Sequence, residues 1–204
     1  MKVKICGIKT KADAQFAAAE GADFIGFVFA PSKRQVTIQT ASSIATGLAE
    51  TVQKVGVFVD PDFEEVEEAI RQVPLDYVQL HGKETPAFAS SLSAPAIKAF
   101  KVKDGHIQGD PSTYPDCLIL LDAPSIEYEG GGGIAFDWEK LDEKKLPQER
   151  LIIAGGLTSD NVDAAIRKFT PLAVDVSSGV ETNGKKDIQK IKQFIQQAKE
   201  RSEK

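Results

Sequence analysis

Residues 151–179, LIIAGGLTSDNVDAAIRKFTPLAVDVSSG, contain two apolar runs separated by one helical pattern. The runs LIIA (151–154) and AVDVS (173–177) are rich in aliphatic residues, as expected of parallel strands that are covered by helices. Between them, residues 158–169 begin with Thr158, a residue type that favours helix N-caps. Apolar side chains recur at helical spacing through this segment. The stretch therefore predicts a strand–helix–strand unit.

The same alternation extends over the rest of the chain. Helical patterns cover residues 10–20, which open with Thr10, residues 61–73, which open with Pro61, and residues 187–199. Residues 102–116 hold two glycines and two prolines, which predicts a short or irregular helix there. Six further strand-like runs precede the two quoted above: VKIC (3–6), DFIGFVF (23–29), KVGVFV (54–59), YVQL (77–80), AIKAF (96–100) and CLILL (117–121).

Eight strands that alternate with helices fit either a closed barrel or a doubly wound open sheet. A G-x-G-x-x-G motif after the first strand would favour the open sheet, but that strand ends in Cys6-Gly7. Polar and glycine-rich residues follow several different strands, which is typical of barrel enzymes. We therefore predict an α/β protein with a single (βα)8 TIM-barrel domain that spans residues 1–204.

Composition narrows the classes of partner. The net charge of -5 argues against nucleic acid, whose phosphates select basic surfaces. No apolar run approaches the roughly 20 residues that span a bilayer, and MKVKICGIKT (1–10) lacks the apolar core of a signal peptide. The two cysteines lie far apart, which is typical of reduced thiols. These features predict a cytoplasmic protein with no membrane partner.

Glycine and serine residues follow the last two predicted strands. Gly155 and Gly156 come after the first of these, and Ser177, Ser178 and Gly179 end the second. The corresponding turns of (βα)8 barrels often hold a phosphate, and glycine N–H groups with serine hydroxyls suit an anion. Each turn alone is compatible with an ordinary tight connection. The two together favour phosphate binding.

Cys6 and Asp122 are the candidate proton-transfer residues. Both follow apolar runs, so both are expected at the rim that carries the phosphate turns. A free cysteine is more often a small buried apolar residue than a catalyst, so the case for Cys6 rests on its position. Partial desolvation would raise the pKa of Asp122 and suit a general acid. A carboxylate that caps a turn is an equal alternative.

Three other polar residues are expected near that rim. Arg34 either forms a solvated pair with Lys33 or presents a fork to a ligand carboxylate. His81 follows the fourth strand, where it contacts a ligand or forms a structural hydrogen bond. Asp175 lies within the last strand, where a buried acid needs partners and either supports the fold or positions substrate. Since His106 is the one other histidine, a metal cluster is hard to assemble, and we expect no metal.

The motifs together resemble the phosphoribosylanthranilate isomerase family of the tryptophan pathway. The similarity covers nearly the whole chain, in the family's order, and VKICGI and VDVSSGVE are its most specific parts. The matching runs are VKICGI (3–8), FVFAPSKR (27–34), VGVFVD (55–60), VQLHG (78–82), LLD (120–122), GGGGIAFDW (130–138), IAGGL (153–157) and AVDVSSGVE (173–181).

The resemblance implies an isomerase that converts N-(5-phosphoribosyl)anthranilate into 1-(2-carboxyphenylamino)-1-deoxyribulose 5-phosphate. This Amadori rearrangement is the third step of tryptophan synthesis from chorismate. By motif, Cys6 corresponds to the general base, Asp122 to the general acid and Arg34 to the group that meets the anthranilate carboxylate. Gly156 and residues 177–179 correspond to the phosphate site. The resemblance implies a small phosphosugar substrate, no cofactor, and a monomer or homodimer.

One motif departs from the family, and two other functions stay open. Gly130 to Gly133 are all glycine, where the family often has a serine or threonine, so only backbone contacts are expected from this loop. A related synthase or epimerase of amino-acid biosynthesis is one alternative, although an indoleglycerol-phosphate synthase is expected to use catalytic lysines at strand ends. A barrel that only binds a phosphate ligand is another, but such a protein has no need of an acid–base pair.

Overall fold

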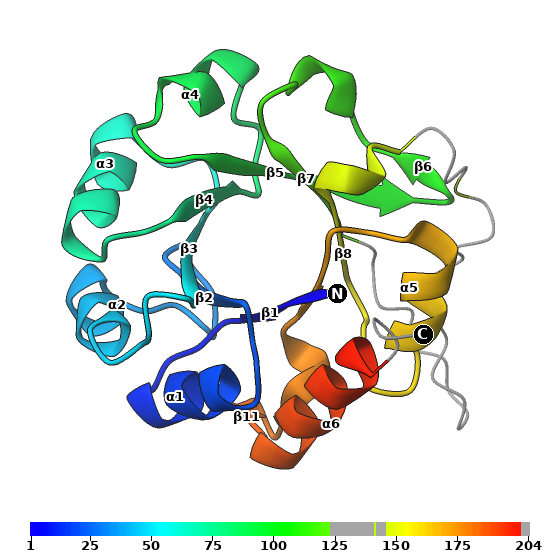
Figure 1. Ribbon diagram of the computed structural model, residues 1–204. Helices are drawn as coiled ribbons and strands as arrows, with labels where there is room; N and C mark the ends of the chain where they lie inside the picture. Colours follow the sequence, from blue (N-terminus) through cyan, green and yellow to red (C-terminus); the bar gives the residue numbers. More distant parts are fainter. Residues whose placement is uncertain (123–140, 142–145, 201–204) are drawn as a thin grey trace.

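A computed structural model describes residues 1–122, 141 and 146–200, and eight parallel strands in it close into a barrel (Figure 1). The strands follow the order β4-β3-β2-β1-β9-β8-β7-β5, and pairing of β4 with β5 closes the ring. The predicted (βα)8 barrel is therefore confirmed. The strands are β1 (Lys2–Cys6), β2 (Phe24–Val28), β3 (Gln53–Phe58), β4 (Tyr77–Leu80), β5 (Ala96–Lys103), β7 (Leu118–Asp122), β8 (Leu151–Ala154) and β9 (Ala173–Val176).

Helices surround the barrel in Figure 1. None of those in the described part of the chain is long and apolar enough to cross a membrane. The α-helices are α1 (Lys11–Ala19), α2 (Ile38–Ala45), α3 (Phe63–Gln72), α4 (Pro86–Ser91), α5 (Val162–Phe169) and α6 (Ile188–Lys199). Short 3-10 helices are η1 (Pro111–Thr113), η4 (Gln148–Arg150) and η5 (Ser178–Val180).

Two segments depart from a simple strand–helix repeat. After β5 the chain turns back as β6 (His106–Ile107), which pairs antiparallel with the end of β5, and continues into η1. The prediction that any helix within residues 102–116 is short or irregular is thereby confirmed. After η5, the short strands β10 (Glu181–Thr182) and β11 (Lys185–Lys186) form an antiparallel hairpin.

Four of the described α-helices, α1, α2, α4 and α6, follow an N-cap residue whose side chain accepts a hydrogen bond from the first turn. Thr10 accepts a hydrogen bond from the Asp13 N–H and caps α1, as the sequence predicts. The predicted start of α3 at Pro61 is wrong, because Asp62 is the N-cap residue and the helix begins at Phe63.

The predicted start of α5 at Thr158 is also wrong, because the helix begins at Val162. The Asn161 side chain accepts a hydrogen bond from the Thr158 N–H and donates one to the Gly156 carbonyl. These bonds stabilise a turn ahead of the helix.

Side chains that alternate along each strand belong to two different parts of the core, one between the strands and the helices and one inside the barrel. In β1, Val3 and Ile5 belong to the large cluster between the strands and the helices. Lys4 and Cys6 alternate with them and therefore face the barrel interior. A second apolar cluster fills that interior and supports the polar residues at the carboxyl ends of the strands. It includes Phe24, Val55, Ile97, Leu120 and Ile152.

Candidate active site

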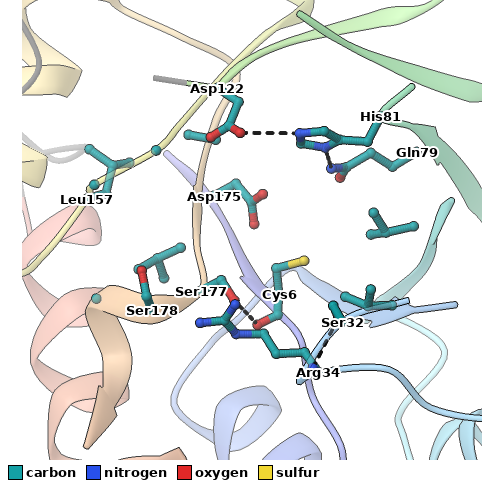
Figure 2. A pocket seen from close by; sticks show the side chains of 17 residues that line it. Cys6, Ser32, Arg34, Gln79, His81, Asp122, Leu157, Asp175, Ser177 and Ser178 are labelled. Carbon is teal, nitrogen blue, oxygen red and sulfur yellow. Dashed lines mark hydrogen bonds and ion pairs between the residues drawn. The ribbon is translucent and has the colours of Figure 1, made fainter. Parts of the chain in front are cut away.

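A cavity of about 500 Å³ lies at the carboxyl ends of the strands. Figure 2 shows polar side chains from several strands that line it together. Every site residue that the sequence predicts lines this cavity. The loop at Gly130 to Gly133 lies outside the described residues. The predicted residues are Cys6, Arg34, His81, Asp122, Gly155, Gly156, Asp175, Ser177, Ser178 and Gly179.

Cys6 is the last residue of β1, and its side chain is buried at the edge of the cavity. Its backbone carbonyl accepts a hydrogen bond of 3.1 Å from the Ser177 hydroxyl, which joins β1 to the loop after β9. Burial raises the pKa of the Cys6 thiol above its ordinary value, and the positive charge of Lys4 opposes that rise. The site therefore contains both a desolvated thiol and a cation that favours its ionised form.

Asp122 is the first member of a hydrogen-bonded chain across the cavity (Figure 2). Its Oδ2 lies 3.2 Å from Nε2 of His81, and Nδ1 of His81 lies 3.1 Å from Nε2 of Gln79. With the Gln79 amide donating to Nδ1, a neutral His81 carries its proton on Nε2 and donates it to Asp122. The Asp122 side chain is 34% exposed.

Gln79 is a site residue that the sequence analysis missed. Its side chain is buried, and Oε1 has no hydrogen-bond partner among the residues that the structure describes. Gln79 lines the cavity, and its amide Nε2 holds the His81 ring through Nδ1. The signal was its position two residues before His81 in VQLHG, since strand residues at i and i+2 share a face.

Arg34 forms a two-pronged ion pair with Glu181 at the mouth of the cavity. Nε lies 2.6 Å from Oε1 and Nη2 lies 2.7 Å from Oε2. Lys186 adds a bond of 3.0 Å to the same carboxylate and one of 2.9 Å to the Ser177 carbonyl. Although burial alone would raise the pKa of Glu181, its hydrogen bonds to Arg34 and Lys186 lower it to about 2. Neither Glu181 nor Lys186 is among the site residues that the sequence predicts.

The turns after β8 and β9 form a cradle of backbone and hydroxyl groups. Gly155 and Gly156 both have positive φ, at 83° and 61°, which glycine adopts without steric cost. Gly179 packs against the carbonyl of Leu157 so closely that a Cβ atom would overlap it. The two turns are thus locked together, with the hydroxyls of Ser177 and Ser178 in the cavity lining. Such a concave group of N–H and hydroxyl donors suits an anion.

Comparisons with known proteins agree with this geometry. The family model described as "N-(5'phosphoribosyl)anthranilate (PRA) isomerase" matches residues 3–197. A Listeria monocytogenes protein named N-(5'-phosphoribosyl)anthranilate isomerase is 56% identical over 199 residues, which are 98% of each chain.

Solved structures agree as well. The phosphoribosyl anthranilate isomerase of Thermotoga maritima is 40% identical, with a TM-score of 0.83 over 98% of this chain and 99% of that one. A second structure is the same type of enzyme in complex with reduced 1-(o-carboxyphenylamino)-1-deoxyribulose 5-phosphate. It is 36% identical, with a TM-score of 0.79 over 98% of this chain and 99% of that one. The chain therefore belongs to the N-(5'-phosphoribosyl)anthranilate isomerase family.

Proposed function

We propose that this chain converts N-(5-phosphoribosyl)anthranilate into 1-(2-carboxyphenylamino)-1-deoxyribulose 5-phosphate, with Cys6 and Asp122 as the proton-transfer pair. The reaction is an Amadori rearrangement and the third step of tryptophan synthesis from chorismate. One observation carries the proposal: Cys6 and Asp122 end two different strands and line the same cavity as the anion cradle. A sugar held by its phosphate in that cradle lies within a cavity that offers both groups.

Asp122 acts first, as the general acid. It protonates the furanose ring oxygen while the nitrogen lone pair of the anthranilate expels that oxygen from C1, so the ring opens to an iminium ion. As the acid, Asp122 enters this step protonated and gives its own proton to the ring oxygen. His81, whose Nε2 lies 3.2 Å from Asp122, donates a hydrogen bond to the carboxylate that remains. Gln79 holds the His81 ring through Nδ1.

Cys6 acts second, as the general base. Its thiolate removes the proton from C2, and the electrons of that bond form the C1–C2 double bond as the iminium nitrogen is neutralised. The resulting enolamine becomes the ketone when its hydroxyl loses a proton and C1 gains one. The cationic iminium makes the C2 proton acidic, so the step requires a base within reach and no electron acceptor.

The remaining residues bind the ends of the substrate. Arg34 uses the N–H groups that Glu181 leaves free to hold the anthranilate carboxylate. Gly155, Gly156 and residues 177–179 hold the phosphate through backbone N–H groups and the Ser178 hydroxyl. His81 and Asp175 face the sugar between these two anchors. Binding both ends fixes the reacting carbons between acid and base.

The direct test is turnover by the purified protein. Mixing it with N-(5-phosphoribosyl)anthranilate should cause loss of substrate fluorescence and accumulation of a product of the same mass. A phosphate-binding barrel without catalysis would leave the fluorescence unchanged. An indoleglycerol-phosphate synthase would instead consume the rearranged product with loss of carbon dioxide and water.

The cellular setting and assembly are part of the proposal. Both cysteines are free thiols in the structure, which supports a reducing compartment such as the cytoplasm. The protein is proposed to act as a monomer or homodimer on a small phosphosugar. Light scattering of the purified protein separates the two assemblies, because their masses differ twofold.

A further inference from the structure

Lys4 is a fully buried lysine inside the barrel, two residues before Cys6 on the same face of β1. Its ammonium nitrogen lies 3.1 Å from Oδ1 of Asp175, which is its register partner on β9. The positive charge of Lys4 favours the ionised form of the Cys6 thiol. A buried ammonium is thus paired with a carboxylate on the face of β1 that carries the proposed base.

Gly26 provides the space for this contact. It is the register partner of Cys6 on β2. A Cβ atom at Gly26 would lie 2.9 Å from the Cys6 sulfur and 3.2 Å from the Lys4 nitrogen. The sulfur and the ammonium therefore crowd against the same point of the β2 backbone, where any larger residue would displace them.

The charges around Cys6 act in different directions. Burial alone would lower the pKa of Lys4, but Asp175 and Cys6 raise it above its ordinary value, so the lysine is charged. Burial raises the pKa of Cys6, Lys4 gives the largest opposing effect, Asp175 raises it further and Lys186 lowers it. Arg34 adds a further cation that interacts with Cys6. Asp122 and His81 line the other side of the same cavity.

We propose that Lys4 is a positioning residue that stabilises the Cys6 thiolate from within the barrel, with Asp175 holding the ammonium in place. The inference rests on the proposed role of Cys6 as the base, which it deepens. It explains how a desolvated thiol can serve as a base, because an ammonium fixed in a low-dielectric interior is screened far less than one at the surface.

The test measures the ionisation of Cys6 without relying on catalysis. In a Cys117→Ala background Cys6 is the one remaining thiol of the chain. Its alkylation by iodoacetamide is followed by mass spectrometry from about pH 6 to about pH 11.5, so that a midpoint above the ordinary thiol value falls inside the range. The midpoint of the rate profile reports ionisation, whereas altered access to the cavity changes only the plateau. Lys4→Met should move the midpoint upward by about one unit and slow alkylation about tenfold at neutral pH.

Two further variants make the result specific. Lys4→Gln removes the charge but keeps an N–H donor for Asp175, and should give the same upward shift if Lys4→Met folds poorly. Lys98→Met removes another buried ammonium, which lies 2.7 Å from Glu84 and packs outside the barrel interior. This matched control should leave the Cys6 midpoint unchanged. Equal midpoints in the parent and both Lys4 variants would overturn the inference.

The pH dependence of kcat separates this inference from the proposed function. If Cys6 is the base, the pH profile of kcat should shift upward in Lys4→Met along with the alkylation profile. A shifted alkylation profile with an unshifted kcat profile would contradict the role of Cys6 as base, while upholding the effect of Lys4 on the thiol. A failure of the Lys4 inference and a failure of the proposed role of Cys6 therefore give different experimental results.

Discussion

The guanidinium of Arg34 and the carboxylate of Glu181 meet edge to edge, with bonds of 2.6 and 2.7 Å between residues that are 147 positions apart in sequence. The pairing uses the Nε–H and one N–H of Nη2. It leaves the Nη1 edge for a second carboxylate, because a guanidinium has five N–H donors in a planar fork. Arg34 is therefore held in place before a ligand arrives.

Replacement of Arg34 by alanine should raise KM more than it lowers kcat. The lost charge-assisted contact to the anthranilate carboxylate predicts a rise in KM of roughly 10- to 100-fold, since such bonds contribute about 1.5–3 kcal/mol. Steady-state kinetics with N-(5-phosphoribosyl)anthranilate measures both constants. Arg34→Lys is the matched control and should recover only part of the loss. A fall in kcat with an unchanged KM would reassign Arg34 to the chemical step.

Glu181 should make the stability of the protein depend on acid pH. The pKa of Glu181 is about 2 in the folded protein against an ordinary 4.5, so its ionised form stabilises the fold. This contribution is complete above about pH 4.5 and is lost as the pH falls toward 2, and the shift corresponds to about 3 kcal/mol. Urea unfolding of wild type and Glu181→Gln over that range should show the difference between them shrinking toward low pH. Parallel stability curves would contradict the ion-pair account.

Gly179→Ala should damage both the fold and the anion cradle. A Cβ atom there would overlap the Leu157 carbonyl, so the turns after β8 and β9 must move apart. We expect a loss of more than about 2 kcal/mol in the free energy of unfolding and weaker binding of inorganic phosphate. Gly184→Ala is the control, because Gly184 has a φ of 73° but open space around it, which predicts a cost of only about 1 kcal/mol. Equal losses in the two variants would argue against locked turns.

Much of the fold and site could be predicted because parallel strands bring their carboxyl ends to one rim. That geometry places Cys6, Asp122 and the turns at Gly155 and Ser177 together once the strands are counted. The pairing of Arg34 with Glu181 could not be predicted, since nothing in either local sequence encodes a partner so far away along the chain.

Three further features, namely the start of α5, Gln79 and Lys4, could not be predicted, each for a different reason. The start of α5 was misplaced because Asn161 stabilises a turn that the apolar pattern does not reveal. Gln79 was missed because a strand glutamine is ordinarily read as exposed. Lys4 shares the Cys6 face of β1, and its burial beside Asp175 follows only from the pairing of β1 with β9.

The central claim is that Cys6 and Asp122 are the base and acid of one proton-transfer pair. Cys6→Ser and Asp122→Asn should each lower kcat by about 100-fold or more. Both variants should still bind reduced 1-(o-carboxyphenylamino)-1-deoxyribulose 5-phosphate in calorimetry, because phosphate and carboxylate contacts lie elsewhere in the cavity. The measurement that decides is the rate of fluorescence loss from N-(5-phosphoribosyl)anthranilate at saturating substrate. Near-complete loss of that rate in Cys6→Ser, with the ligand still bound, is the predicted result, and turnover equal to the parent would contradict the account.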